Sequence, residues 1–267
     1  MNTELSIIIV DYKSFDFTSE LISDLEKRLL SVKFEIIVVD NNSGNETVKK
    51  LRKLVAEKKN LKIAKAKRNM GFGAGNNLGA KIAKGEYLLL LNPDIHLIDN
   101  SIEKMLDFLS RHSEIGALSP LLYQKDGKTL QKHFFGNFQS LVGITIKRWQ
   151  GKEANLNADF FYTDMVSAAT LMIKRELFEK VDGFDQNFFM YIEDDDLCRR
   201  ISDLGYKNAV LCGAKVIHFE GQSSTSFEKK KYYYKSQNYY WQKHYGPAKT
   251  FLMKIFRVPY IWLQNIK

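Results

Sequence analysis

Four consecutive acidic residues, Glu193–Asp194–Asp195–Asp196, are the clearest local sign of chemistry in the 267-residue sequence. Carboxylates this close repel one another, and the repulsion raises the pKa of at least one of them, which suits a general base. An acidic run also complements the positive end of a helix dipole, so helix capping is the structural alternative. Four acids exceed what a cap needs, and we therefore expect a functional role here.

A carboxylate at the end of an apolar strand marks a second candidate site. Asn92–Pro93–Asp94 follows Leu88–Leu91, where a hard oxygen ligand could hold a divalent ion that bridges two phosphates. His218 follows another apolar run and could supply an imidazole to a metal or a diphosphate. The alternatives are a proline turn that merely ends the strand and a structural histidine.

Two further segments have the composition of a nucleotide site. Asp40–Asn41–Asn42–Ser43 follows an apolar strand, where a carboxylate can accept hydrogen bonds from a base or a ribose. Asn69–Asn77 holds three alternating glycines before a helix and could cradle a phosphate, with Arg68 just upstream to neutralise charge. An Asx-turn and a structural glycine turn remain the alternatives, and the loop does not match the dinucleotide-binding fingerprint.

These residues need a sheet to bring them together, and the first half of the sequence alternates strands with helices as a parallel sheet requires. The expected strands are Ser6–Val10, Phe34–Val39, Leu61–Ala64 and Tyr87–Leu91, and the expected helices are Phe17–Leu30, Glu46–Lys58 and a third that ends at Lys84. Ligands bind outside the carboxyl ends of such strands, which is where Asp11, Asp40 and Asp94 fall.

The second half is less regular. A helix over Ser101–Arg111 is followed by an irregular insert, Gln124–Asp159, that could cover a site. The later expected elements are an ordered segment at Met165–Ile173, helices that begin at Arg175 and at about Glu193, a strand over Val210–Val216 and an aromatic, basic tail from Glu228 that Pro259 interrupts.

In this order, the motifs resemble those of family-two glycosyltransferases of the GT-A fold, and most of all the bacterial rhamnosyltransferase branch. The resemblance covers roughly Ser6 to Ser224. It rests on Ser6–Tyr12, Val38–Ser43, Asn69–Asn77, Leu90–Asp94, Asp182–Asp185, Tyr191–Arg199 and His218. Asn-Pro-Asp stands where many relatives carry Asp-x-Asp.

The resemblance implies an inverting transfer of a sugar from a nucleotide diphosphate to an acceptor hydroxyl, with Mg²⁺ or Mn²⁺ on the diphosphate. Asp194 would be the base, Glu193 would position the acceptor, and Asp196 would hold the helix or an arginine such as Arg199 or Arg200. Asp94 and His218 would bind the metal. The implied nucleotide-sugar site comprises Val10, Asp11, Tyr12, Asp40, Asn42, Arg68, Asn69, Gly71, Asn77, Asn92 and Asp94.

By resemblance, the donor is dTDP-rhamnose and the acceptor is a saccharide or a polyprenyl-linked saccharide of a bacterial surface polysaccharide. A UDP-sugar donor, a catalytically silent nucleotide-sugar-binding scaffold and a nucleotidyltransferase that releases pyrophosphate are the alternatives. The expected fold is α/β of GT-A type: a Rossmann-like, mostly parallel sheet flanked by helices over 1–225, with a nucleotide half over 1–98, an acceptor half over 99–225 and a C-terminal helical extension over 226–267.

The composition and charge of the sequence limit the partners and the cellular location that we expect. The net charge of +9 favours an anionic partner, but no nucleic-acid module is recognisable, and we expect no nucleic-acid partner. Two cysteines exclude a disulfide scaffold, and with neither a signal peptide nor a transmembrane run we expect a cytoplasmic protein.

The tail mixes aromatic and basic residues, among them Trp241, Tyr245, Phe251, Leu252, Ile255, Phe256, Tyr260 and Trp262 with Lys243, Lys249, Lys254, Arg257 and Lys267. Contact with the inner face of the membrane and packing on the catalytic domain or on a partner subunit of a homodimer both stay open.

Overall fold

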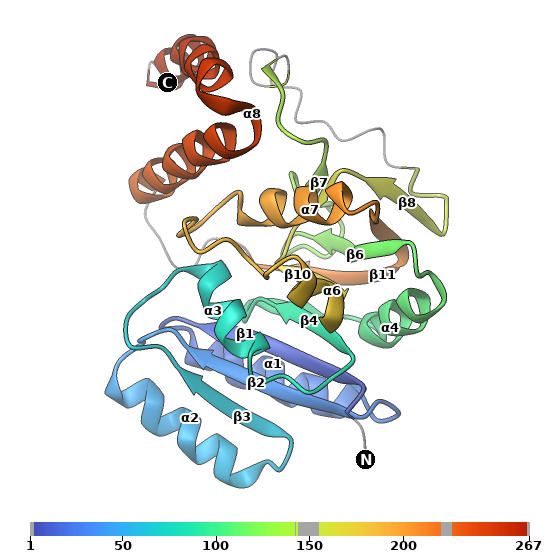
Figure 1. Ribbon diagram of the computed structural model, residues 1–267. Helices are drawn as coiled ribbons and strands as arrows, with labels where there is room; N and C mark the ends of the chain where they lie inside the picture. The colour runs from blue at the N-terminus through green and yellow to red at the C-terminus, as the bar shows by residue number, and fades with distance from the viewer. Residues whose placement is uncertain (1–2, 142, 144–154, 220–225, 266–267) are drawn as a thin grey trace.

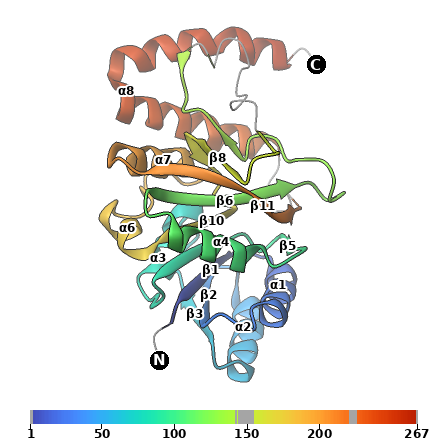
Figure 2. The same ribbon diagram turned by 90° about the vertical axis from the view of Figure 1, so that its right-hand side faces the viewer.

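A computed structural model describes residues 3–141, 143, 155–219 and 226–265 of the chain. Its centre is a nine-stranded sheet in the order β3-β2-β1-β4-β10-β6-β11-β5, with β8 paired on β11. Helices cover both faces: α3 and α6 lie on one side of the strands, and α1 and α2 on the other (Figures 1 and 2). The predicted α/β fold with a mostly parallel sheet is confirmed.

The first half forms a parallel sheet because its strands are short apolar runs separated by amphipathic helices. Its elements are β1 (Leu5–Asp11), α1 (Phe15–Arg28), β2 (Phe34–Asp40), α2 (Asn45–Glu57), β3 (Leu61–Lys65), α3 (Phe72–Ala80) and β4 (Tyr87–Leu91). β1 pairs in parallel with both β2 and β4. Asp11 and Asp40 are register partners at the ends of β1 and β2, so the polar residues that follow these strands meet at one edge.

The second half adds antiparallel pairings to the sheet. Its elements are β5 (Ile95–Leu97), α4 (Ser101–Arg111), β6 (Ile115–Tyr123), β7 (Phe135–Gly136), β8 (Phe160–Thr163), β9 (Met165–Val166), β10 (Thr170–Lys174), α6 (Arg175–Lys180), α7 (Glu193–Asp203) and β11 (Lys207–His218). β10 lies antiparallel between β4 and β6, and β11 runs parallel to β6. β5 and β6 were not anticipated from the sequence. The predicted irregular insert contains β7, and its residues 142 and 144–154 lie outside the described residues.

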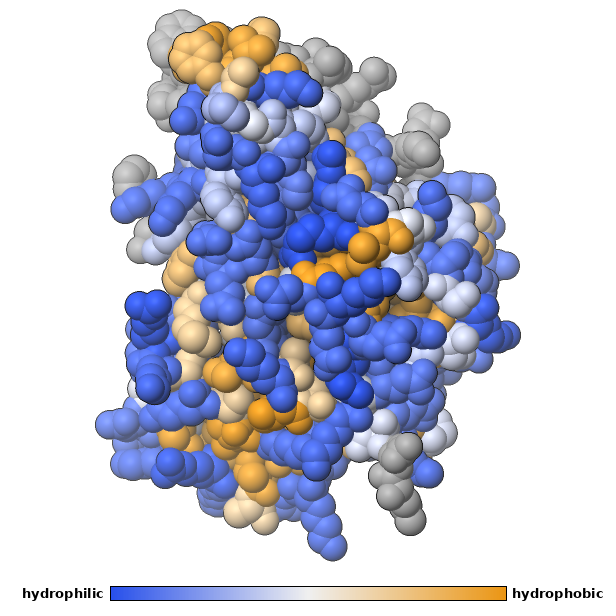
Figure 3. Space-filling model, in the orientation of Figure 1, coloured by the Kyte–Doolittle hydropathy of each residue, from blue (hydrophilic) through white to orange (hydrophobic). Residues whose placement is uncertain are grey.

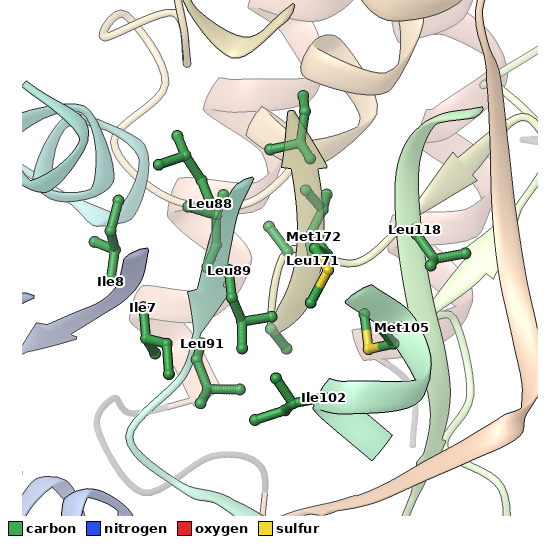
Figure 4. Packing of buried hydrophobic residues seen from close by; sticks show 14 of the residues in the cluster. Ile7, Ile8, Leu88, Leu89, Leu91, Ile102, Met105, Leu118, Leu171 and Met172 are labelled. Atoms are coloured by element: carbon green, nitrogen blue, oxygen red, sulfur yellow. The ribbon is translucent and has the colours of Figure 1, made fainter. Parts of the chain in front are cut away.

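The core is continuous across both halves. Leu88, Leu89 and Leu91 of β4 lie between Ile7 and Ile8 of β1 and the side chains of β10, α4 and β6 (Figure 4). Because both faces of these strands are covered by helices, nearly every β4 side chain is fully buried. This shared core fixes residues 3–98 to the rest of the sheet.

The C-terminal region is one helical element, α8 (Ser226–Asn265), interrupted at Gly246. The prediction that Pro259 interrupts it is wrong, because α8 continues through that residue. The break lies at Gly246, whose φ of +79° suits glycine, and Pro247 opens the next helical segment, where a missing N–H is tolerated. α8 lies at the end of the molecule opposite to the N-terminus (Figure 1). Among the described residues, no helix is long and apolar enough to cross a membrane.

Candidate functional site

The acidic run sits at the start of α7, where the backbone is strained. Tyr191 and Ile192 both have positive φ, +69° and +67°, directly before Glu193. Such conformations cost free energy and are maintained only when surrounding contacts enforce them. They turn the chain so that Glu193 and Asp195 point into the protein, while Asp194 is half-buried and partly open to solvent.

The environment of these carboxylates separates their proton affinities. Burial raises the pKa of Glu193 to about 8, and the Asp194 carboxylate beside it adds to the rise. Burial, followed by the charges of Asp194 and Glu193, holds the pKa of Asp195 well above its usual range. Burial also raises the pKa of Asp194, although backbone N–H groups of Ala168 and Asp195 donate to its two oxygens at 3.4 and 3.1 Å. Asp194 is thus the partly open carboxylate that combines a raised proton affinity with donors favouring its ionised form.

Asp196 has a different, structural environment. Its fully buried carboxylate accepts hydrogen bonds from Arg200 Nε at 2.8 Å and from His244 at 2.7 Å, and it pairs with Lys243 at 2.7 Å. Burial alone would raise its pKa, but the His244 hydrogen bond and the charges of Arg200 and Lys243 bring it below the usual value. Arg200 is therefore the arginine that Asp196 contacts, and the other two partners come from α8.

The Asn-Pro-Asp motif meets His218 across the sheet. His218 Nε2 lies 3.3 Å from Asp94 Oδ1 and 3.3 Å from Asn92 Nδ2. His218 Nδ1 is 3.0 Å from Gln131 Oε1. The pairing of β11 with β5 creates this meeting, because it sets His218 opposite Ile95, next to Asp94. Three residues named from the sequence therefore form one cluster.

The hydrogen bonding of this cluster fits a cation. Because Gln131 Oε1 can only accept, Nδ1 carries the proton, and in a neutral imidazole Nε2 then presents a lone pair. Nε2 then lies 3.3 Å from Asn92 Nδ2, which can donate to it, and 3.3 Å from the Asp94 carboxylate, so the cluster presents one nitrogen and one carboxylate ligand that could bind a metal ion. Among the described residues, no group of three or more His, Cys, Asp or Glu side chains could hold a metal. Asp94 and His218 would hold one only with further ligands, such as phosphate oxygens and water.

The metal motif and the acidic run meet at a single dipeptide. Ala169 O accepts a hydrogen bond from Asn92 N at 2.9 Å, and Ala168 N donates to Asp194 Oδ2. Because consecutive Cα atoms are about 3.8 Å apart, this Ala168–Ala169 link connects the start of the Asn-Pro-Asp motif to the Asp194 carboxylate through neighbouring residues. Nothing in the composition of Ala168–Ala169 marked it beforehand.

The β2 end of the site offers an unused acceptor. Asp40 is fully buried, and its Oδ1 accepts from Ser43 N at 2.9 Å, which is the expected Asx-turn. Its Oδ2 is buried without a partner among the described residues, an arrangement that costs free energy unless a ligand donates to it. Asp11, by contrast, is fully used: Oδ2 accepts from Thr18 at 2.6 Å and from Ser14 at 3.3 Å, and Oδ1 accepts from Ser43 Oγ at 2.9 Å.

The glycine loop is tied to this turn by Asn41, a residue that the sequence analysis did not assign to the site. Asn41 Nδ2 donates to Asn69 Oδ1 at 3.0 Å and to Gly71 O at 3.1 Å, and Asn41 Oδ1 accepts from Met70 N at 2.9 Å. Asn69 Oδ1 also accepts from Gly71 N. Asn41 is buried directly after Asp40 at the end of β2, and its position in the same strand-end turn is the signal that could have identified it.

The glycines themselves permit close packing. A Cβ at Gly71 would lie 2.0 Å from Phe189 O, and one at Gly73 would lie 2.8 Å from the Phe184 side chain. Asn77 donates to Phe184 O at 2.7 Å and accepts from Phe184 N at 2.8 Å. The loop and α3 therefore contact the segment that leads into α7.

The structure places several other predicted nucleotide-site residues at half-buried or exposed positions. Tyr12 is half-buried with the Lys13 ammonium 5.3 Å from its ring centroid. Asn42 and Arg68 are exposed. Val10 is half-buried, and a Cβ at Gly75 would approach its side chain to 2.8 Å.

α8 packs against the segment that leads into α7 and against Gln139. Trp241 Nε1 donates to Gln139 Oε1 at 2.9 Å, Tyr239 OH donates to Asp185 at 2.9 Å, and Ser236 Oγ donates to Met190 O at 2.8 Å. Lys243, His244, Gln131 and Gln139 support the site, yet no sequence motif distinguishes them because their partners lie far away in the chain. An aromatic-lined cavity of about 280 Å³ between β8 and the end of α7, which includes Phe161, Tyr206 and Asn208, lies apart from all of these residues.

The comparisons agree with this architecture. The profile of "Glycosyl transferase family 2" matches residues 6–182, and that of "N-terminal domain of galactosyltransferase" matches residues 148–222. An N-acetylglucosaminyl-diphospho-decaprenol L-rhamnosyltransferase of Mycobacterium tuberculosis is 26% identical over 210 residues, 71% of this chain and 67% of that protein. The rhamnosyltransferase WbbL of Escherichia coli K12 is 28% identical over 170 residues, 59% of this chain and 64% of that protein.

Solved structures share the fold at low identity. TarS 1–349 of S. aureus superposes with a TM-score of 0.59 at 18% identity, covering 90% of this chain and 72% of that one. The mannosyltransferase PcManGT of Pyrobaculum calidifontis, solved with GDP-Man and Mn²⁺, gives 0.61 at 14% identity, covering 84% and 59%. GalNAc-T7, solved with UDP, GalNAc and Mn²⁺, gives 0.64 at 18% identity, and this chain spans 46% of its length.

The family profile covers about two thirds of the chain, from β1 to the turn before Gly183. It includes the Asp40 turn, the glycine loop and the Asn-Pro-Asp motif, which the structure joins to Asp194 through Ala168–Ala169. With its GT-A architecture and its carboxylate site, the chain belongs to glycosyl transferase family 2 and is a glycosyltransferase.

Proposed function

We propose that this glycosyltransferase moves L-rhamnose with inversion from dTDP-rhamnose to a hydroxyl of a saccharide or lipid-linked saccharide. The observation that carries the proposal is that Ala168–Ala169 hydrogen-bonds both to Asn92, which forms one cluster with Asp94 and His218, and to Asp194. It supports a site in which the diphosphate and the acceptor lie on neighbouring sides. Relatives named as rhamnosyltransferases support the sugar.

Asp194 serves as the general base in this proposal. Inversion requires a group opposite the leaving diphosphate that takes the acceptor proton while the acceptor oxygen bonds to the anomeric carbon and the bond to the diphosphate breaks. The half-buried position of Asp194 leaves its carboxylate within reach of a hydroxyl, and its raised pKa increases its proton affinity. Glu193, with a pKa raised to about 8 and an Oε2 that has no partner among the described residues, stays largely protonated at neutral pH and can donate to the acceptor.

The donor end uses the other side of the site. Asp40 Oδ2 accepts a hydrogen bond from the base or the ribose, since it is buried without a partner in the described structure. Asp94 and His218 would hold Mg²⁺ or Mn²⁺ together with phosphate oxygens, and the ion would supply positive charge to the leaving diphosphate. Arg68 is exposed beside the loop and adds positive charge there.

Donor-dependent thermal stabilisation tests this function. A ligand that binds only the folded chain raises its Tm, so we expect dTDP-rhamnose with Mg²⁺ or Mn²⁺ to raise Tm by several degrees, and more than dTDP-rhamnose with EDTA. In Asp94→Asn and His218→Ala, the metal-dependent part should fall at least tenfold in apparent affinity. Asp107→Asn, an exposed carboxylate on α4, is the matched control.

The panel also separates the alternatives. A larger shift with a UDP-sugar would replace the rhamnose assignment, and the GDP-Man and UDP-GlcNAc in neighbouring structures make those sugars natural members of the panel. No shift with any nucleotide sugar would contradict the proposed site. Pyrophosphate release from a nucleoside triphosphate would indicate nucleotidyl transfer instead.

A further inference from the structure

The segment of α8 after Gly246 presents large apolar side chains to solvent. Their exposed fractions run from 42% to 63%, in the residues Phe251, Leu252, Ile255, Phe256 and Val258. Figure 3 shows an apolar area at this end of the molecule, at the top in the orientation of Figure 1. A cluster of this kind is unusual on a soluble surface and marks an interaction site.

These five residues, which we call the α8 apolar face, lie on one side of the helix. At about 100° per residue, they fall within an arc of roughly 160°. The opposite side is fixed to the protein: Met253 is fully buried, Thr250 is 4% exposed, and Arg257 donates to Gln237 Oε1 at 2.9 Å. The helix is therefore held in an orientation that points the apolar face outward.

Positive charge borders this face. Lys249 and Lys254 are both exposed, and helical geometry places them at the two edges of the apolar arc. Residues 226–267 contain nine basic residues and one acidic residue, so this segment carries +8 of the net +9 of the whole chain. Exposed Lys230 and Lys231 of the first α8 segment add to it.

We propose that the α8 apolar face docks on the surface of an anionic lipid bilayer, with Lys249 and Lys254 at the headgroup level. A helix with an apolar arc and flanking lysines lies in the plane of such an interface, its apolar side chains between the headgroups and the acyl chains. A second copy of the chain is the less favoured occupant, because face-to-face pairing would bring two strongly basic segments together. This docking does not require a particular sugar donor, and it is a property separate from the proposed transfer reaction.

Docking at this face would also orient the catalytic end. The first α8 segment contacts α7 through Lys243 and His244, both on Asp196, two residues after Asp194. A lipid surface that holds α8 therefore holds this rigid connection as well. That placement suits an acceptor whose lipid part stays in the bilayer.

Vesicle flotation of the full chain tests the proposal. We expect binding to phosphatidylcholine vesicles that contain phosphatidylglycerol, at least tenfold weaker binding to pure phosphatidylcholine, and loss of binding in high salt. Phe251→Ser, Ile255→Ser and Phe256→Ser combined should lower binding at least tenfold. The matched control is Leu30→Ser, Ile98→Ser and Leu204→Ser combined, which removes exposed apolar residues elsewhere and should leave vesicle binding unchanged.

A second pair of variants tests the charge. Lys249→Gln with Lys254→Gln should weaken binding to anionic vesicles several-fold, whereas Lys235→Gln, exposed on the first α8 segment, should have a smaller effect. Absence of anionic vesicle binding, or equal loss in the control triple variant, would overturn the proposal. A dimer in sedimentation that the Phe251, Ile255 and Phe256 substitutions dissociate, without vesicle binding, would assign the face to a second copy. Nucleotide-sugar stabilisation, measured on the same samples without lipid, reports separately on the proposed function.

Discussion

At the residue scale, the four consecutive acidic residues 193–196 differ in burial and in hydrogen-bond partners, although the sequence does not distinguish them. Asp194 is half-buried, Glu193 and Asp195 are buried and each has one oxygen without a partner in the described part of the chain, and Asp196 is buried beside Arg200 and Lys243. The sequence could predict that one of them would have a raised pKa, because four adjacent carboxylates must repel. It could not predict which one, because two of the three partners of Asp196, Lys243 and His244, come from α8, almost 50 residues later.

Asp195 should make the protein less stable as pH rises. Its native pKa is well above that of an unfolded aspartate, so the native state binds more protons than the unfolded state between the two values, and the free energy of unfolding falls with pH across that window. We expect Asp195→Asn, which cannot ionise, to raise Tm at pH 8 more than at pH 5. Each pKa unit removed corresponds to about 1.4 kcal/mol.

Thermal melts across pH 5 to 8 check this expectation. Asp16→Asn changes an exposed carboxylate in the first turn of α1 and serves as the control, with the same pH dependence as the parent. A Tm difference between Asp195→Asn and the parent that is constant across pH would show that Asp195 is ionised in both states, contrary to this account.

At the element scale, the glycine loop joins the two halves of the molecule. Gly71 has φ +85°, and its Cβ position is 2.0 Å from the Phe189 carbonyl oxygen. We expect Gly71→Ala to lower the free energy of unfolding by about 2 kcal/mol or more, because both strain and a backbone clash are introduced. Gly44→Ala is the matched variant, since Gly44 also has positive φ, +108°, but no atom within 4 Å of its Cβ position.

Denaturant unfolding of the two variants separates clash from strain. Gly44→Ala should cost about 1 kcal/mol, the cost of a left-handed alanine alone. Equal destabilisation by both variants would mean that the close approach of the Phe189 backbone to the loop does not hold in solution.

α8 supports α7 through buried charge. Replacing Lys243 by Met removes its contacts with Asp196 and Asp185, both at 2.7 Å, and leaves the fully buried Asp196 and the half-buried Asp185 with fewer partners. We expect a loss of about 2 to 3 kcal/mol in unfolding free energy, since breaking one side of a buried pair leaves uncompensated charge. Lys235→Met, in the same helix but exposed, should change stability by less than about 0.5 kcal/mol.

The Asp196 cluster also has a defined acid limit. Its pKa is lowered in the folded chain, so the stability it provides is present above the ordinary aspartate pKa and disappears as pH falls below it. The loss in free energy of unfolding caused by Lys243→Met, measured by urea unfolding, should therefore become smaller below about pH 4. A cost that persists unchanged to pH 2 would indicate lost packing rather than lost charge pairing.

At the scale of the whole molecule, the sequence predicted the alternating strands and helices of the first half because each has a clear apolar period. It did not predict β6 over Ile115–Tyr123, whose run includes Pro120 and lies next to an insert without motifs. The sequence also did not predict that the two segments of α8 differ in burial. Trp241 is buried against Gln139, whereas Phe251 is exposed. Both are aromatic residues among lysines, and only the break at Gly246 separates them.

The central claim is that one carboxylate, Asp194, takes the acceptor proton in a site that binds the donor without it. The direct measurement compares Asp194→Asn with the parent in two assays on the same preparation: metal-dependent stabilisation by dTDP-rhamnose, and transfer of labelled rhamnose to saccharide and lipid-linked acceptors. Asp203→Asn, an exposed carboxylate at the other end of α7, is the control. We predict that Asp194→Asn keeps donor binding within about threefold and lowers transfer by about 10² to 10⁴-fold, while Asp203→Asn transfers like the parent. Transfer by Asp194→Asn within tenfold of the parent would contradict the claim and move the base to Glu193 or Asp195.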